Sequence, residues 1–332
     1  MKNISLYTVL LLLAMVVGSC DHETDTFDGP NLIDRFGPFN FTADLEVNRT
    51  TVDFSAGQAV RMTAQFNKNV NFVIQITGQE SGAVKTIEAF GRQLDDTNAV
   101  WDGGTTDLPF FREETCTIEL IIPEESLTQS VEVEIVGTRV YPGSLFTDFE
   151  SGLAGNVEIG NFEFELTPNT GVRMDGNAAQ ANSYYLMEGT DNVLRNFFCG
   201  LHIIGAGVTG SEYAPVPTTV PEDLYFNAFL YSDGRPHTIA VIEFVFDSND
   251  NGSVDESDAL FKLDGDFPID WTGWRQISHT MADVGMTEEQ VSKIVGIRLV
   301  LISNDAAQPT PPLEVAFGID FMTFTSGGPL EL

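Results

Sequence analysis

Basic residues are scarce in this chain. Its 332 residues include 16 Lys and Arg against 49 Asp and Glu, which gives a formal net charge of −33. Binding to a phosphate backbone or to anionic lipid headgroups requires clustered Lys and Arg. The composition therefore excludes nucleic-acid binding and makes strongly anionic polysaccharides poor ligands.

Cysteine and histidine are few as well, with three and four residues. This count excludes a disulfide framework and a zinc site. Cys116 and Cys199 stand among apolar residues, so we expect two buried free thiols. Motifs of serine hydrolases, P-loop enzymes and zinc proteases are missing. The sequence also lacks the E-x-D-x-x-E spacing of acids found in many β-sandwich glycoside hydrolases. Glu163 and Glu165 alternate on one strand face and are explained as solvated residues. The sequence predicts a protein that is not an enzyme.

Long apolar runs are limited to the N-terminus, where Leu6 to Val17 follows a positively charged start. This run is short for a membrane span, and it ends in Val-Gly-Ser-Cys, which resembles the lipobox of bacterial lipoproteins. The resemblance implies that residues 1–19 are a signal peptide and that Cys20 is lipidated and anchors the protein to the membrane. An ordinary secretory signal is the alternative.

An acidic tether, residues 20–38, follows the predicted anchor. Its acids resemble the surface-export signal of Bacteroidota lipoproteins, although His22 and Thr24 interrupt them. In other bacteria, an Asp directly after the lipidated cysteine directs retention at the inner membrane. We expect an outer-membrane protein exposed at the cell surface.

The rest of the chain alternates apolar and polar residues with period two and predicts an all-β protein. Residues 39–140 read as an Ig-like β-sandwich with Trp101 in its core or packed at its edge, and residues 145–327 as a β-jelly roll. One short helix is expected near residues 287–290, where Thr287 and Gln290 have capping-box spacing.

Three short motifs resemble galactose-binding-like jelly rolls: Asp-Phe-Glu at 148–150, Gly-Trp-Arg-Gln-Ile at 273–277 and Gly-Ile-Asp-Phe-Met-Thr-Phe at 318–324. With the leader and the Ig-like region, the whole chain resembles the SusE-like surface glycan-binding lipoproteins of Bacteroidota. The resemblance implies a carbohydrate-binding module that captures a neutral polysaccharide without catalysis. It also implies an outer-membrane glycan transporter complex as a partner.

An acidic segment, 247–258, matches the spacing of an EF-hand calcium loop, with glycine at its sixth position, although the flanking helices are missing. We expect a structural calcium ion here; a solvated acidic hairpin is the alternative. The predicted ligands are Asp247, Asn249, Asn251, Ser253, Asp255 and Asp258.

A second calcium site is implied by the resemblance alone. In many such jelly rolls, a Glu of the first strand and an Asp of the last strand together hold one ion. The matching positions are Glu150 and Asp320.

Sugar binding requires aromatic faces for stacking and side chains that hydrogen-bond to hydroxyls. Trp271 follows a turn and is expected to be more exposed than Trp274, which begins a strand. The predicted ligand-binding residues are Trp271, Tyr184, Tyr185, Arg195, His202, Tyr213 and Tyr231.

Two other functions stay open from the sequence. A structural or adhesin-like surface protein would share the leader and the calcium but would lack a saturable sugar site. A polysaccharide-degrading enzyme would release reducing ends.

Overall fold

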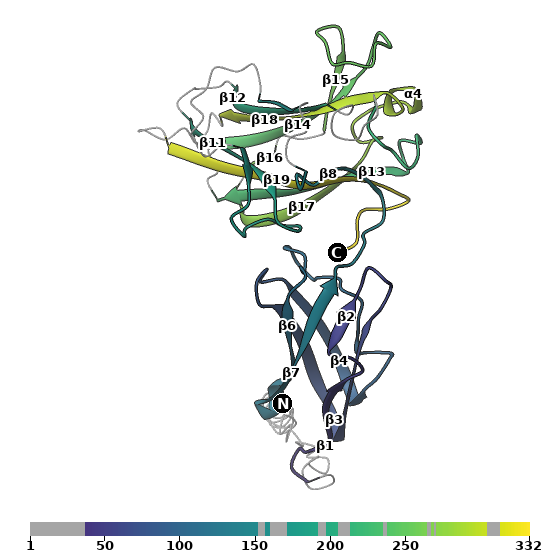
Figure 1. Ribbon diagram of the computed structural model, residues 1–332, viewed down its shortest axis with the longest axis vertical. Coiled ribbons are helices and arrows are strands. Elements are labelled where there is room, and N and C mark those ends of the chain that lie inside the picture. Colours follow the sequence, from purple (N-terminus) through teal and green to yellow (C-terminus); the bar gives the residue numbers. More distant parts are fainter. Residues whose placement is uncertain are drawn as a thin grey trace, which may run out of the picture.

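The computed structural model describes residues 37–151, 157–159, 171–191, 197–204, 213–234, 238–263, 267–268, 270–303 and 313–332. The predicted leader, the anchor Cys20, the tether before residue 37, Glu163, Glu165 and Arg195 lie outside these residues. The prediction of an all-β protein is confirmed, because the regular secondary structure of the described residues is almost entirely strand, arranged in curled sheets (Figure 1). In this part of the chain, no helix is both long and apolar enough to cross a membrane.

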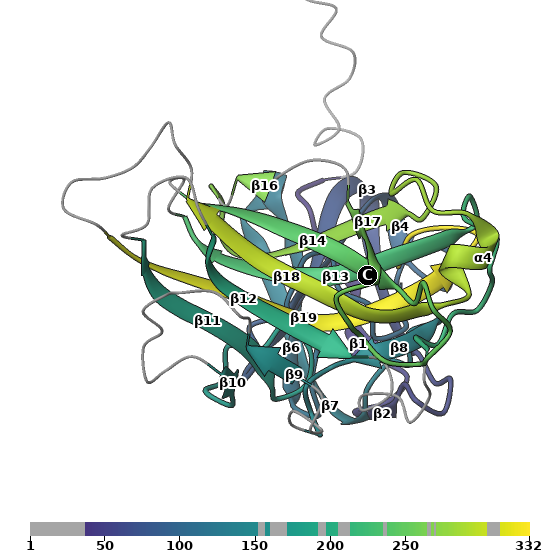
Figure 2. The same cartoon turned by 90° about the horizontal axis from the view of Figure 1, so that it is seen from above.

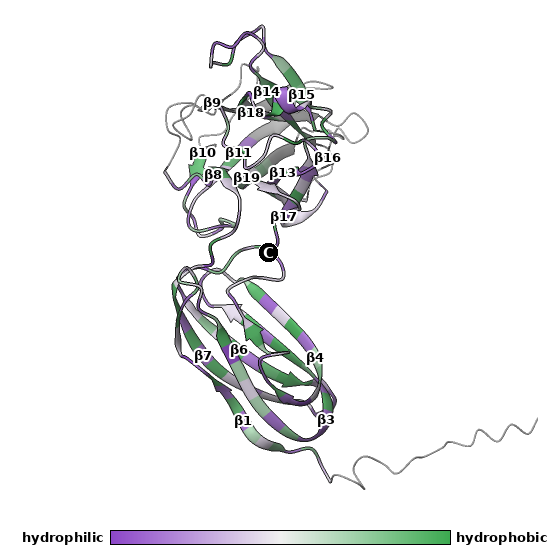
Figure 3. Cartoon of the chain, turned by 90° about the vertical axis from the view of Figure 1, so that its right-hand side faces the viewer, coloured by the Kyte–Doolittle hydropathy of each residue, from purple (hydrophilic) through white to green (hydrophobic). Residues whose placement is uncertain are grey.

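The N-terminal unit is a curled sheet of strands β1 to β7 in the order β1-β3-β6-β7-β2, with β4 and β5 also paired to β3. All described pairs are antiparallel except β2 with β7. Its strands are β1 Phe41–Val47, β2 Thr51–Asp53, β3 Val60–Gly78, β4 Val84–Leu94, β5 Val100–Trp101, β6 Thr115–Ile122 and β7 Leu127–Gly137. Apolar and polar residues alternate along them (Figure 3), so that one face forms a core.

Strand β3 is longer than the alternation predicts, because it runs without a break through Asn67-Lys68-Asn69. Lys68 takes an inward position between Phe66 and Val70 and is 8% exposed. Its ammonium group forms an ion pair with Glu125 of the short 3-10 helix η1, Pro123–Glu125, at 2.5 Å. A buried cation is stable only when it is paired, and this long-range partner is not visible in the local sequence.

Trp101 lies fully buried in the N-terminal core, as the core interpretation expects. Its indole Nε1 donates to the Gly104 carbonyl at 2.9 Å. The rings of Phe54 and Phe111 lie against it, each with a centroid distance of 4.8 Å. Trp101 therefore stabilises the unit and presents no face to a ligand.

The C-terminal unit contains two antiparallel sheets that face each other (Figures 1 and 2). Sheet 2 has the order β10-β11-β19-β13-β17 with β8 also paired to β19, and sheet 3 has the order β15-β14-β18-β12-β9 with β16 paired to β14. The strands of sheet 2 are β8 Ser144–Thr147, β10 Gly171–Arg173, β11 Tyr184–Asp191, β13 Leu224–Asp233, β17 Thr272–Thr280 and β19 Leu313–Ser326. Those of sheet 3 are β9 Val157–Ile159, β12 Phe197–Ile204, β14 Thr238–Phe246, β15 Ala259–Lys262, β16 Phe267–Pro268 and β18 Ile294–Ser303.

The main core fills the space between sheets 2 and 3. It includes Phe226 and Leu230 of β13, Phe244 of β14 and Phe317 of β19, each fully buried. The outer face of each sheet lies outside this core and is available for other functions. At one end of the unit, helix α4, Glu288–Val291, begins with the predicted capping box of Thr287 and Gln290.

The two units meet through Phe110, which lies between β5 and β6. Its ring stacks on Tyr141 at a centroid distance of 4.0 Å and lies edge-on to Phe229 of β13 at 5.0 Å. Its N–H donates to the Ala179 carbonyl at 2.7 Å. Phe110 is 3% exposed, so a residue of the N-terminal unit is buried against sheet 2.

The last residues of the chain lie between the two units (Figure 1). Leu330 is 4% exposed and belongs to the same apolar cluster as Phe110. Its N–H donates to Asn227 Oδ1 at 2.9 Å, and its carbonyl accepts from Gln276 Nε2 at 2.8 Å. This segment therefore adds apolar contact to the interface.

The thiol of Cys116 in β6 is fully buried, and burial, followed by the charge of Glu114, raises its pKa to about 12. Only the thiolate reacts with thiol reagents. The test uses residues 21–332 with Cys199→Ser, so that Cys116 is the one thiol present. At about pH 8, we expect Cys116 in the folded protein to react at less than about a thousandth of the rate measured in urea-unfolded protein. A colorimetric thiol assay measures both rates, and comparable rates would contradict the buried position.

Candidate functional site

An aromatic patch lies on the outer face of sheet 2. It consists of Tyr184 of β11, Tyr231 of β13 and Trp274 of β17. The Trp274 ring lies edge-on to Tyr184 at 5.4 Å and tilted against Tyr231 at 5.5 Å. Tyr184 is 2% exposed, whereas Tyr231 and Trp274 are half-buried. Two partly exposed rings are thus held in place by packing.

Polar groups border the aromatic patch. The Tyr184 hydroxyl donates to Asp175 Oδ2 at 3.2 Å, and Arg173 Nε lies 3.8 Å from the same oxygen. Burial raises the pKa of Tyr184 to about 12, so the phenol stays a hydrogen-bond donor at neutral pH. Trp274 Nε1 donates to the Asn177 carbonyl at 2.7 Å. Exposed rings beside fixed donors and acceptors can bind a sugar ring and its hydroxyls.

The two tryptophans differ from the sequence expectation. Trp271 is half-buried against the main core, and the Arg275 guanidinium lies 4.8 Å from its ring centroid. Trp274, expected inside, lies on the outer face of sheet 2 instead. The reason is the alternation of β17: Ile277 points into the core, so Trp274, three residues earlier, points outward.

The other predicted ligand residues are dispersed. Tyr185 is fully buried in the main core and serves packing. The Tyr213 hydroxyl donates to Asp247 Oδ2 at 2.9 Å, so Tyr213 contacts the acidic segment 247–258. His202 lies in β12, opposite Arg298 of β18. The structure therefore brings together Tyr184 and Tyr231, with Trp274 as the neighbour that sequence reasoning placed elsewhere.

Sheet 3 carries charged residues at neighbouring positions. Glu243 of β14 is paired with Arg298 of β18 on one side and with Lys262 of β15 on the other. Arg298 Nε lies 3.3 Å from Glu243 Oε2, and these two side chains are 17% and 16% exposed. Sequence reasoning singled out only His202 in this row, because a cross-strand row becomes visible only once the register is known.

The acidic segment 247–258 forms a turn in which several of the predicted ligands hydrogen-bond to one another. Asp255 Oδ2 accepts from the side-chain amides of Asn249 at 2.9 Å and Asn251 at 2.7 Å. Gly252 has φ +71°, a conformation that favours glycine. Ser253 donates its N–H to Asn251 Oδ1, and Asp258 accepts from the Asp255 N–H. The loop therefore presents oxygen atoms at the predicted spacing.

Two carboxylates of this loop, those of Asp247 and Asp255, are stabilised in their ionised form. Hydrogen bonds from Ser257, and then from Asn249, lower the pKa of Asp255 to about 2. Burial alone would raise the pKa of Asp247, but hydrogen bonds from Gly252 and Tyr213 outweigh burial and lower it. Charged oxygens at neutral pH are what a hard cation requires.

Glu150 and Asp320 lie at a second acidic position, as the resemblance implies. Asp320 is fully buried, and its Oδ2 accepts from the Gln180 N–H at 2.8 Å. Glu150 Oε1 accepts from the N–H groups of Asn182 at 2.8 Å and Ser183 at 2.6 Å. Burial raises the pKa of Asp320; the N–H groups of Gln180, Phe321 and Ala179 oppose this effect, and the charge of Glu150 adds to it.

The groups around this pair fit a calcium ion in part. The side-chain oxygen Oε1 of Gln180 is buried without a hydrogen-bond partner, and it belongs to the residue whose N–H binds Asp320. Among the described residues, no three His, Cys, Asp or Glu side chains converge as a metal-binding group. An ion at this pair would therefore take further oxygens from the Gln180 amide and from main-chain carbonyls.

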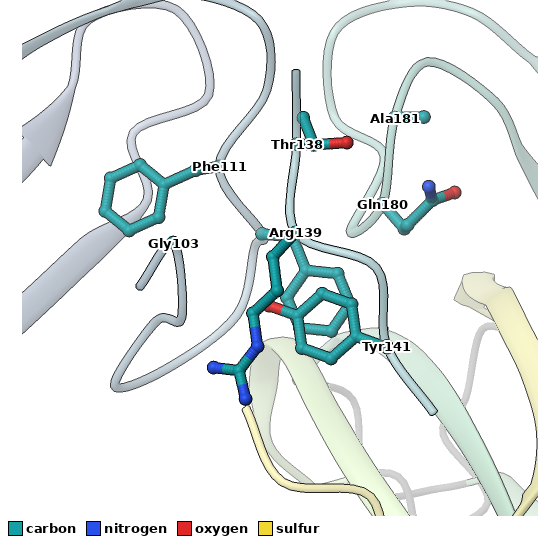
Figure 4. A pocket seen from close by; sticks show the side chains of 8 residues that line it. Gly103, Phe111, Thr138, Arg139, Tyr141, Gln180 and Ala181 are labelled. Carbon is teal, nitrogen blue, oxygen red and sulfur yellow. The ribbon is translucent and has the colours of Figure 1, made fainter. Parts of the chain in front are cut away.

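A small cavity of about 40 Å³ lies between the two units, close to this pair (Figure 4). Gln180 and Ala181 line it from the C-terminal unit, and Phe111 and Arg139 from the N-terminal side. The Arg139 guanidinium lies 5.1 Å from the ring centroid of Tyr141. A cavity of this size holds one or two water molecules and is too small for a sugar.

The sequence matches no protein-family profile and no curated protein. Solved structures to which it is similar include carbohydrate-binding modules. SGBP-B from a complex xyloglucan utilization locus in Bacteroides uniformis is 12% identical, with a TM-score of 0.39 over 87% of this chain and 73% of that chain. The CBM22-1 xylan-binding domain of Paenibacillus barcinonensis Xyn10C is 12% identical, with a TM-score of 0.34 over 57% of this chain and 97% of that chain.

Calcium removal tests the acidic segment. If the loop holds an ion, EDTA lowers the melting temperature and excess Ca²⁺ restores it, because the ion removes repulsion among the ionised carboxylates. Asp255→Ala should abolish most of this response, since Asp255 is a predicted ligand and also binds the side chains of two others, Asn249 and Asn251. Asp283→Ala, at an exposed acid outside the loop, is the matched control in differential scanning fluorimetry. An equal EDTA response in both variants would contradict the site.

Proposed function

We propose that this protein is a lipid-anchored surface protein that binds a neutral polysaccharide without cleaving it. The observation that carries the proposal is the aromatic patch. Tyr231 and Trp274 are partly exposed, held in place by neighbouring rings, and bordered by Asp175 and Arg173. Rings fixed in this way bind flat sugar faces at a low cost in conformational entropy.

Charge restricts the class of glycan. A net charge of −33 repels polyanions, and Arg173 in the patch is already close to Asp175. Hydroxyl-rich neutral chains need only stacking and paired hydrogen bonds. The proposed substrates are therefore neutral polysaccharides, with affinities on the order of micromolar to millimolar for a shallow site.

The leader supports a location at the outer membrane. A lipid on Cys20 would hold the chain at the cell surface, and the C-terminal unit would capture a polysaccharide there. We propose that the protein then delivers the glycan to an outer-membrane transporter. Calcium, in this proposal, is a structural ion of the acidic segment and of the Glu150–Asp320 pair.

The two tryptophans provide the sharpest test. Trp274→Ala should weaken binding about tenfold, since a lost stacking face costs about 1–2 kcal/mol. Trp271→Ala, which removes a ring already covered by Arg275, should bind as the parent protein does. Affinity gel electrophoresis against β-glucans, α-glucans, mannans and xylans measures retention, and alginate serves as the anionic control.

The same panel separates the alternatives. If both tryptophan variants lose retention equally, the binding site lies outside the aromatic patch. Arg298→Ala would then test whether sheet 3 binds the glycan. Retention on alginate alone would contradict the charge argument. Reducing ends released from any glycan would identify an enzyme. Retention on no glycan, together with calcium-dependent stability, would favour the structural or adhesin-like function.

A further inference from the structure

The segment 174–183, here called the coupling loop, lies between β10 and β11 of sheet 2. Three of its main-chain carbonyls bind the N-terminal unit, whereas the Asn177 carbonyl accepts from Trp274 of the C-terminal unit. Arg112 Nη2 donates to the carbonyls of Gly176 and Ala178, at 3.0 Å each. The Phe110 N–H donates to the Ala179 carbonyl at 2.7 Å. Three hydrogen bonds thus join this loop to the other unit.

The N–H groups of the same loop face the opposite way. Gln180 donates to Asp320, and both Asn182 and Ser183 donate to Glu150. Glu150 follows β8 and Asp320 lies in β19, so two segments that are far apart in the sequence but paired in sheet 2 hold the loop from behind. We call these two residues the carboxylate clasp.

Backbone strain is concentrated at the clasp. Phe149, Ala181 and Phe321 have φ values of 61°, 45° and 41°. Each is next to a residue of the clasp or to a loop residue bound by it. Such conformations are unfavourable for residues other than glycine and persist only where the surrounding contacts fix them. The loop is therefore held in one conformation by Glu150 and Asp320.

We propose that the carboxylate clasp sets the relative orientation of the two units. By fixing the coupling loop, Glu150 and Asp320 hold the carbonyls that bind Phe110 and Arg112 in position. Loss of the clasp would free the loop and weaken the interface, although neither acid has a hydrogen bond with the N-terminal unit in the described structure. The inference concerns the shape of the protein and does not rest on glycan binding.

Glu150→Ala is the first test, made on residues 21–332 in EDTA so that only the protein's own groups act. We expect hydrogen–deuterium exchange to become at least about tenfold faster at Asn182 and Ser183, and also at Phe110 in the other unit. Small-angle X-ray scattering should show a larger maximum dimension. Glu150→Gln should stay within about twofold of the parent protein, because its remaining oxygen can still accept both N–H groups.

Three further variants make the test specific. Arg112→Ala should speed exchange at Phe110 but leave Asn182 and Ser183 protected, because it breaks the interface without touching the clasp. Glu222→Ala, at an exposed glutamate of the same unit, should change neither. If Glu150→Ala does not fold, Asp320→Asn preserves the shape of the side chain and should still speed exchange at Gln180 and Phe110.

Two outcomes would overturn the proposal. In the first, Glu150→Ala speeds exchange in the coupling loop while Phe110 and the scattering curve stay unchanged. In the second, Glu150→Ala changes exchange at neither place. Either result means that the interface is maintained by Phe110 and the apolar cluster around it, independently of the clasp.

Discussion

Strand β19 is the constraint on which the C-terminal unit depends. It hydrogen-bonds with β11, β13 and β8, so its register fixes most of sheet 2. Its inward residues, among them Phe317 and Ile319, fill the main core. Its other residues carry the features that face the solvent and the other unit. The alternation of faces is interrupted at Phe321, which has φ 41°, so that Asp320 and Phe321 both lie outside the main core.

Gly318, Asp320 and Phe321 of β19 each support a different feature of the C-terminal unit. A Cβ added at Gly318 would lie 3.0 Å from the Cβ of Tyr231 and 3.3 Å from Cδ2 of Tyr184, so glycine allows the aromatic patch to pack. Asp320 forms part of the clasp. Phe321 stacks on Phe229 at 5.4 Å in the cluster that receives Phe110. A shift of one residue in this strand would disrupt all three.

Local patterns made much of this fold predictable. Period-two alternation predicts the all-β class, and the spacing of Thr287 and Gln290 predicts helix α4 with its cap. The spacing of residues 247–258 predicts a loop with a sharp turn at Gly252, and the structure has this turn. In each case, the interactions responsible lie within about twelve residues, so the sequence itself contains the information.

Long-range partners account for what could not be predicted. Lys68 looks like a turn residue until Glu125 is brought beside it by the fold. Trp274 looks like a core residue until the register of β17 turns it outward. Phe110 stands in an irregular segment that gives no periodic signal, and its partners Phe229 and Phe321 come from another unit.

The acidic segment 247–258 and the carboxylate clasp accommodate negative charge in opposite ways. Asp255 is exposed and is kept ionised by hydrogen bonds from Ser257, Asn249 and Asn251. Asp320 is buried, and desolvation disfavours its charge even though N–H groups of the coupling loop point at it. A cation at the first position would mainly relieve repulsion between charges already present. At the second it would supply the countercharge that burial demands.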